Sequence, residues 1–368
     1  MELTLIWPKQ KRERRLEEVL TFALENIKVK QTIYEPEELQ AAIRQGKLQK
    51  ERILFAVNPG EAGINLKLYA MLEILRMNGG CLKDSIAGIL VDGNEEYYTK
   101  SIGREVARTA NKAGCWFVGR PLTEGTGSLQ NYKIIASNGR CTLYEAYLRT
   151  ARELAERVAV FEKPVYQKPK LLCVHSCNPS TSNTFSLWKE VKAKLPEEIK
   201  VREISLRNGA VPDCAGCAYD MCMYFSRNSS CFYGGPIVEE VYPALEECNG
   251  LILLCPNYND ALGANLTAFI NRLTALFRKK PFEDKCLFAL IVSGYSGGDI
   301  LERQLIGSLN MNKSFILPGY FSMAETANNP GSIMEIQDIH KKTTDFAARI
   351  SACMGQGQAN SENNKCDK

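Results

Sequence analysis

Short apolar segments alternate with amphipathic helical segments along almost the whole chain, and the same order occurs twice. Five segments of the first half have the character of β-strands: residues 3–7, 29–34, 52–60, 86–93 and 115–121. Five of the second half do as well: residues 170–176, 201–206, 250–257, 287–294 and 314–320. Alternation of strands and helices predicts parallel sheets that helices cover on both faces. We therefore expect an α/β fold with two doubly wound, five-stranded parallel sheets in tandem.

A proline-punctuated break separates the two repeats. The stretch EKPVYQKPK, residues 162–170, contains Pro164 and Pro169 and interrupts the helical pattern before it. With 368 residues the chain is also too long for one ordinary core. We expect a first domain over residues 1–163, a second over residues 164–354, and a polar, disordered tail over residues 355–368.

The net charge and the cysteine content limit which functions are expected for the chain. A formal charge of +4, spread over the chain, favours neither nucleic-acid nor membrane-surface binding. The N-terminus does not resemble a signal peptide and no stretch is long enough to span a bilayer, so a cytoplasmic location is expected. In a reducing compartment the 14 cysteines indicate buried thiols, a metal or cluster site, or redox chemistry. Only two histidines leave little room for a histidine-based triad, which favours a cofactor.

The loop after the first strand of the second repeat is rich in small polar residues. The segment NPSTSNT, residues 178–184, lies between a predicted strand and a predicted helix. Its backbone N–H groups and the positive end of the following helix can face one anion, with hydroxyl and amide side chains beside them. A helix cap explains one such residue, but five in seven positions exceed what a cap requires. The loop predicts a cradle for a phosphate monoester held by neutral donors.

Two further loops follow later strands of the second repeat. PNYN, residues 256–259, supplies amides and an aromatic ring, and SGYSGGD, residues 293–299, has glycines that permit close backbone approach. If the strand order is 2-1-3-4-5, all three loops meet outside the carboxyl ends of the strands, where open α/β sheets bind ligands.

With these motifs the second half resembles the flavodoxin-like NAD(P)H-dependent FMN reductase family, which includes the iron–sulfur flavoproteins. The resemblance covers about residue 170 to the start of the tail. It implies bound FMN, with NAD(P)H as a transient hydride donor. It implies phosphate contacts from Ser180, Ser182, Asn183 and Thr184. For the ring and ribityl chain it implies Pro256, Asn257, Tyr258 and Asn259, and for the pyrimidine side Ser293, Gly294, Tyr295 and Gly297.

The first half is similar in outline only. Its first loop, WPKQKRERRL, puts bulky charged side chains where a phosphate would approach the backbone. We expect a degenerate copy that no longer binds flavin and that packs on the second domain or covers its active site. A different anion attracted by Lys9, Lys11, Arg12 and Arg14 is the alternative.

A cysteine-rich loop follows the second strand of the second repeat. Cys214, Cys217, Cys222 and Cys231 have the spacing C-x2-C-x4-C-x8-C. Four thiolates in one loop suit a four-iron cluster or a tetrahedral zinc, and thiols that only structure the loop are the alternative. The resembling iron–sulfur flavoproteins carry a more tightly spaced motif in this region.

The expected function is a flavin-dependent oxidoreductase that passes hydride from NAD(P)H to FMN and on to a small-molecule or redox-protein acceptor. An iron–sulfur flavoprotein that carries single electrons between a 4Fe–4S cluster and the flavin is the first alternative. A non-enzymatic flavodoxin-like sensor or interaction protein is the second. The resemblance implies a homodimer, although the tandem repeat could mimic one within a single chain.

Overall fold

The computed structural model describes residues 1–11, 13–206 and 211–355. By its contacts the chain divides into two compact units. The first unit comprises Met1–Glu162 together with Phe277–Glu283 and Gly297–Ser322. The second comprises Lys163–Leu276, Asp284–Ser296 and the residues from Met323 on.

The first unit is built on a five-stranded sheet with the order β2-β1-β3-β4-β5. Its strands are β1 (Glu2–Ile6), β2 (Lys28–Ile33), β3 (Arg52–Val57), β4 (Ile86–Asp92) and β5 (Trp116–Gly125), and the pairings are parallel. Between and after them lie α1 (Arg14–Ala23), α2 (Pro36–Arg44), η1 (Glu61–Gly63), α3 (Leu66–Met77), α4 (Thr99–Lys112), η2 (Gln130–Tyr132), α5 (Lys133–Gly139) and α6 (Leu143–Val160).

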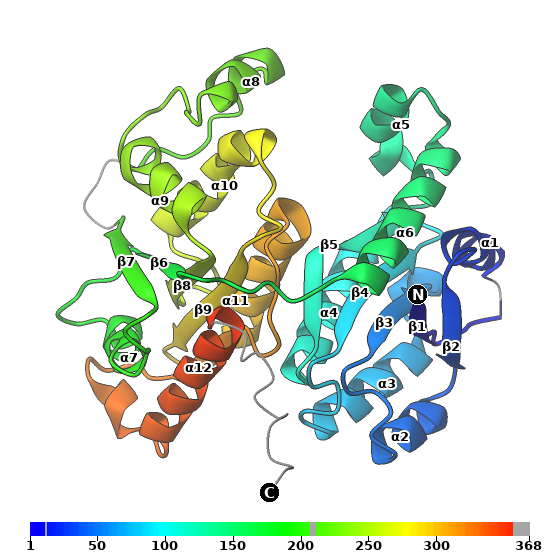
Figure 1. Ribbon diagram of the computed structural model, residues 1–368, viewed down its shortest axis with the longest axis horizontal. Coiled ribbons are helices and arrows are strands. Elements are labelled where there is room, and N and C mark those ends of the chain that lie inside the picture. The colour runs from blue at the N-terminus through cyan, green and yellow to red at the C-terminus, as the bar shows by residue number, and fades with distance from the viewer. Residues whose placement is uncertain (12, 207–210, 356–368) are drawn as a thin grey trace, which may run out of the picture. The chain divides into compact units, whose positions relative to one another are not determined.

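Helices cover both faces of this sheet. Every residue of the interior strand β4 is buried, as expected for a parallel strand with helices on either side. The helix α1 packs on α6, which lies over β3, β4 and β5. Figure 1 shows α2, α3 and α4 on the opposite face. The apolar positions of α4, such as Ile102, Val106 and Ala110, recur at helical spacing and are buried.

The second unit carries a sheet with the same order, β10-β9-β8-β6-β7. Its strands are β6 (Lys170–His175), β7 (Lys200–Ser205), β8 (Gly250–Pro256), β9 (Cys286–Ser293) and β10 (Ser322–Thr326). The helices along this half of the chain are α7 (Asn183–Lys192), α8 (Tyr219–Arg227), η3 (Ile237–Val241), α9 (Tyr242–Glu247), α10 (Ala264–Lys279), η5 (Ser332–Glu335) and α12 (Ile339–Met354). The helices α7 and α12 pack together, with α7 over β8 and β9, and Figure 1 shows α9 and α10 on the other face. The prediction of two doubly wound, flavodoxin-like sheets in tandem is confirmed.

One predicted strand is wrong. Residues 314–320 do not form the fifth strand of the second sheet; β10 does, a few residues later. The segment is apolar because Phe315, Ile316 and Leu317 are buried in the first unit. There Leu317 forms an isolated antiparallel bridge with Phe117 of β5. Pro318 has no backbone N–H with which to continue such a ladder.

The same part of the chain adds two helical segments to the first unit, α11 (Gly298–Leu305) and η4 (Ile306–Met311). No helix within the described residues is long and apolar enough to cross a membrane. The tail predicted as disordered lies outside the described residues from residue 356 on.

Candidate functional site

The topological switch point of the second sheet lies between the neighbouring strands β6 and β8. The chain leaves β6 toward the β7 edge, whereas it continues from β8 toward β9 and β10. Loops that follow such neighbouring strands diverge and leave a crevice at the carboxyl ends of the strands. The loops after β6 and β8 therefore stand at the position where doubly wound sheets bind ligands.

Asn178 organises the loop after β6. Its side-chain Oδ1 accepts hydrogen bonds from the backbone N–H of Ser180, at 3.2 Å, and from its hydroxyl, at 2.9 Å. Its carbonyl accepts from the N–H groups of Thr181, at 3.3 Å, and Ser182, at 2.9 Å. Ser182 is the N-cap of α7, and its Oγ accepts from the N–H of Phe185 at 3.3 Å. The small polar residues thus form a compact turn that delivers the chain into the first turn of a helix.

The predicted phosphate residues are not all free to face a ligand with their side chains. Asn183 is 7% exposed, and its Nδ2 donates to the carbonyls of Ala327, at 3.2 Å, and Asn329, at 2.8 Å. Its Oδ1 accepts from the N–H of Gly331 at 2.9 Å. The Asn183 amide therefore anchors the segment after β10. Asn183 and Thr184 are the first two residues of α7, where backbone N–H groups have no intrahelical acceptor, so their backbone is available to an anion.

Asn257 directly follows β8 and links the second and third loops. Its N–H donates to the carbonyl of Val292 at 2.9 Å, and its Nδ2 donates to the Ser293 hydroxyl at 3.1 Å and to the Ser296 carbonyl at 3.0 Å. The other end of the same amide, Oδ1, is buried and has no hydrogen-bond partner among the described residues. Buried polar atoms are nearly always paired in folded proteins, so an acceptor left over at this position indicates a missing donor.

A tight turn presents Tyr258 to solvent. Asn259 and Asp260 both have left-handed backbone angles, with φ of 53° and 58°. The N–H and carbonyl of Tyr258 pair with those of Ala261 at 3.2 and 3.1 Å, which is the pattern of a type I′ turn. The Tyr258 side chain is 57% exposed. An added Cβ at Gly263 would lie 3.6 Å from both the Ser176 hydroxyl and the Tyr258 ring, so the first and second loops converge at this glycine.

The third loop follows β9. Ser293 is buried, and its carbonyl accepts from the N–H of Ala327 at 2.9 Å. An added Cβ at Gly294 would lie 3.0 Å from Asn328 Oδ1, which is tighter than ordinary side-chain contacts. Tyr295 is 82% exposed. Gly297, with φ of 89°, is the N-cap of α11 and is counted with the first unit.

His175 supports the first loop, although no pattern in the sequence indicated that it belongs to the site. It ends β6 and is buried, and its Nδ1 accepts from the N–H of Cys177 at 3.2 Å. Its Nε2 lies 3.8 Å from Glu203 Oε1. Burial lowers the pKa of His175, and Glu203 only partly opposes this shift. The neutral imidazole, with Nδ1 as acceptor, fixes the start of the loop.

The equivalent place in the first unit is closed by the protein's own side chains. Glu13 is 4% exposed, and its carboxylate accepts from Trp7 Nε1 and from the N–H of Gln10, both at 2.7 Å. Burial raises the pKa of Glu13, although these hydrogen bonds act in the opposite direction. Asn58 follows β3 as Asn257 follows β8, but its Nδ2 donates to the Asp92 carbonyl and its Oδ1 accepts from the N–H of Gly60, each at 2.8 Å.

The Glu13 carboxylate thus occupies one backbone donor of the first loop and the Trp7 indole, and both ends of the Asn58 amide are paired. That the first unit does not bind flavin stays a prediction. Of the four cations considered for a different anion, Lys9 pairs with Glu17 at 2.7 Å and Arg14 with Glu18 at 2.9 Å. Lys11 lines a cavity of about 1040 Å³, and Arg12 lies outside the described residues.

The cysteine loop is not assembled as a metal site. Cys214 is exposed, and Cys217, Cys222 and Cys231 are half-buried. Within residues 1–11, 13–206 and 211–355, no group of three or more His, Cys, Asp or Glu residues could hold a metal ion. The spacing C-x2-C-x4-C-x8-C is therefore not matched by a ligand set in this structure. Cys222 lies in α8, which along the chain follows Cys214 and Cys217 and precedes Cys231.

Comparison with known proteins relates the C-terminal half of the chain to a described family. Residues 169–328 match the family model described as NADPH-dependent FMN reductase. No curated protein matches the chain. Three solved structures illustrate the similarity. Smu.1420 from Streptococcus mutans UA159 is 16% identical, with 50% of this chain and 98% of that chain covered and a TM-score of 0.37. The Trp repressor binding protein from Bacillus subtilis is 17% identical, with 47% and 95% covered and a TM-score of 0.33.

The third is the FMN-dependent NADH-azoreductase from Bacillus anthracis str. Ames Ancestor, determined in complex with FMN. It is 12% identical, with 50% of this chain and 99% of that chain covered and a TM-score of 0.34. The family match spans all three loops after β6, β8 and β9. It confirms the resemblance predicted from the motifs: the C-terminal half of the chain carries the sequence pattern of the NADPH-dependent FMN reductases.

Proposed function

We propose that the chain is an FMN-dependent NAD(P)H oxidoreductase whose flavin site is the crevice between the loops after β6 and β8. The observation that carries the proposal is the buried, unpartnered Oδ1 of Asn257 at this crevice. A flavin ring has an N–H group on its pyrimidine edge, and this group can donate a hydrogen bond to an amide oxygen. The same position in the first unit, Asn58, has no such vacancy, because both ends of its amide are paired.

The phosphate of FMN would be held without a cation. The N–H groups of Asn183 and Thr184 open α7, and the helix dipole adds partial positive charge at this end. The hydroxyls of Ser180 and Ser182 lie in the same turn. Asn183 contributes through its backbone, since its side chain holds the segment after β10.

When bound, FMN supplies the hydride and electron chemistry, and the protein supplies binding, orientation and electrostatics. Asn257 would orient the ring edge of bound FMN, and it ties the second loop to the third. The rings of Tyr258 and Tyr295, in the second and third loops, are exposed. A nicotinamide and then an acceptor would bind beside these loops in turn. The acceptor is a small molecule or a redox protein. A 4Fe–4S cluster on Cys214, Cys217, Cys222 and Cys231 stays a prediction and is not part of this proposal.

The first test is the absorbance spectrum and flavin content of the purified protein. We expect bound or readily acquired FMN, and bleaching of the flavin by NADH or NADPH under anaerobic conditions. The double variant Ser182→Val with Thr184→Val should lose FMN while keeping its fold. Ser186→Val, on the same helix but beyond its first turn, serves as the matched control. Retention of FMN at wild-type affinity by the double variant, or a wild type that cannot take up FMN, would contradict the proposal.

A further inference from the structure

A second cavity lies within the first unit, and four arginines are among the residues that line it. It has a volume of about 750 Å³ and is formed by side chains of α3, α4 and α11. Arg76, Arg104, Arg108 and Arg303 contribute to its wall, together with the carboxylates of Glu105 and Asp299. The proposed flavin site does not include any of these residues.

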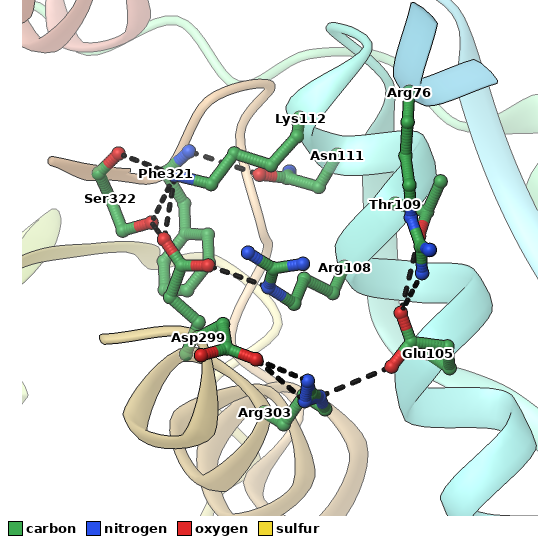
Figure 2. A network of polar contacts seen from close by, with 11 residues as sticks. Arg76, Glu105, Arg108, Thr109, Asn111, Lys112, Asp299, Arg303, Phe321 and Ser322 are labelled. Carbon is green, nitrogen blue, oxygen red and sulfur yellow. Dashed lines mark hydrogen bonds and ion pairs between the residues drawn. The ribbon is translucent and has the colours of Figure 1, made fainter. Parts of the chain in front are cut away.

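Part of this positive charge is neutralised by a buried carboxylate. Glu302 is 1% exposed, and its two oxygens accept from Arg108 Nε at 2.7 Å and Lys112 Nζ at 2.6 Å. The Ser322 hydroxyl donates to it at 2.7 Å. Figure 2 shows these side chains converging from α4 and from the α11 region. A buried carboxylate with two cationic partners and a hydroxyl is fully satisfied.

A second set of ion pairs lies at the mouth of the cavity. Arg303 Nε lies 3.1 Å from Glu105 Oε2, and Arg303 Nη1 donates to Asp299 at 3.0 Å. Arg76 Nη2 donates to the other oxygen of Glu105 (Figure 2). In this group every carboxylate has at least one arginine partner, so none of them is available to a further cation.

The arginines, in contrast, are in excess. Five cationic side chains, including Lys112, face three carboxylates, which leaves two positive charges without a counterpart. Arg104 makes no hydrogen bond or ion pair within the described part of the chain, and its Nε is buried without an acceptor. Among the residues that the structure describes, Arg108 contacts Glu302 through Nε alone, so its two terminal nitrogens are available (Figure 2).

Packing holds Arg104 in this place. An added Cβ at Gly307 of η4 would lie 2.9 Å from Arg104 Cδ, so the side chain runs closely over that glycine. A buried guanidinium N–H without an acceptor is costly, and the cost is removed by an anionic ligand. The fixed fork of a guanidinium matches phosphate oxygens in a bidentate manner.

We infer that this cavity is a binding site for a phosphate group, either free phosphate or the phosphate of a small organic monoester. A phosphate monoester carries about −1.5 to −2 charges near neutral pH, which matches the excess of two positive charges. The Tyr69 ring, 48% exposed, and Ile300 line the same cavity and offer a surface to the organic part of a monoester. The inference does not depend on the flavin site.

Calorimetric titration of the full chain with inorganic phosphate and with AMP tests this site. We expect both probes to bind the wild type, and Arg104→Gln to weaken both at least tenfold. Arg14→Gln removes the same charge from a side chain that is 92% exposed and should have no effect. If AMP binds several-fold more tightly than phosphate and Tyr69→Ala removes only that difference, the natural ligand is an organic monoester. Equal affinities identify free phosphate.

Two controls separate this inference from the flavin proposal. The Ser182→Val, Thr184→Val variant should bind phosphate as the wild type does, whatever its effect on FMN. Arg104→Lys keeps the charge without the fork and should bind with intermediate affinity, which reports on the site if Arg104→Gln does not fold. Absence of binding at millimolar phosphate and AMP, or unchanged binding by both Arg104 variants, would overturn the inference.

Discussion

Asn257 and Asn58 form a natural pair for one decisive experiment. Each directly follows the third strand of its sheet along the chain, and each is tied to the neighbouring loop by its Nδ2. Only Asn257 has a buried Oδ1 without a partner. We expect Asn257→Ala to weaken FMN binding, and Asn58→Ala to leave FMN binding unchanged while it destabilises the fold.

The magnitudes follow from the hydrogen bonds at each site. One neutral hydrogen bond between Asn257 and the flavin contributes about 1–1.5 kcal/mol. Its loss corresponds to an affinity roughly five- to tenfold weaker. Asn58→Ala removes two hydrogen bonds of 2.8 Å from a residue that is 2% exposed. We expect a loss of about 2 kcal/mol in the free energy of unfolding, which lowers the melting temperature by roughly 4–8 °C.

Two assays on the apoprotein separate these effects. Quenching of flavin fluorescence during titration with the protein gives the FMN dissociation constant, and circular dichroism during heating gives the melting temperature. The reasoning is refuted if Asn257→Ala binds FMN within twofold of the wild type. It is equally refuted if Asn58→Ala weakens FMN binding as strongly as Asn257→Ala does.

Three further outcomes test the charges and the first loop. Glu302→Gln should lower the free energy of unfolding by about 2–3 kcal/mol in urea titrations, less than a fully buried pair because Arg108 and Lys112 reach solvent. Glu2→Gln, which breaks an exposed pair with Lys28, should leave the free energy of unfolding nearly unchanged. Burial alone would raise the pKa of Glu302, but Lys112, Ser322 and Arg108 together lower it below its ordinary value of 4.5. The contribution of ionised Glu302 to the free energy of unfolding is therefore fully present above pH 4.5 and is lost as the pH falls through the lowered pKa. The acid limb of stability should therefore be shallower in Glu302→Gln. Burial lowers the pKa of His175 from its ordinary value of 6.5. As the pH falls, the imidazole is therefore protonated in the unfolded chain before it is protonated in the folded protein. The free energy of unfolding should decrease as the pH falls below about 6.5. His175→Gln should reduce this decrease between pH 7.5 and 5.5, and an unchanged slope would contradict the role given to the neutral imidazole.

The sheet architecture could be predicted from the sequence because it depends on local periodicity. Apolar runs such as residues 250–255 are buried and form strands, and the helices between them have apolar residues at regular spacing. The three loops could be located for the same reason, since each follows a predicted strand. Local patterns therefore identified the three loops that the proposed site would use.

Partners that are distant in the sequence could not be predicted. Residues 314–320 have the apolar character of a strand, but their buried position comes from Phe117, about two hundred residues earlier. Glu302 and Arg108 are likewise 194 residues apart, and either could have been a solvated charge on its helix. The role of Asn183 as an anchor for the segment after β10 depends on carbonyls that no pattern in its own loop reveals.

The two sheets share one strand order, yet their switch points differ in how their polar groups are satisfied. In the first unit Glu13 occupies the donors of the first loop, and both ends of the Asn58 amide are paired. In the second unit the loop has neutral donors at a helix N-terminus and one buried acceptor, Asn257 Oδ1, without a partner. A buried unpaired acceptor costs about 1–3 kcal/mol. A fold can close such a place with its own side chains, as the first unit does, so the open acceptor in the second unit is best explained by a ligand that completes it.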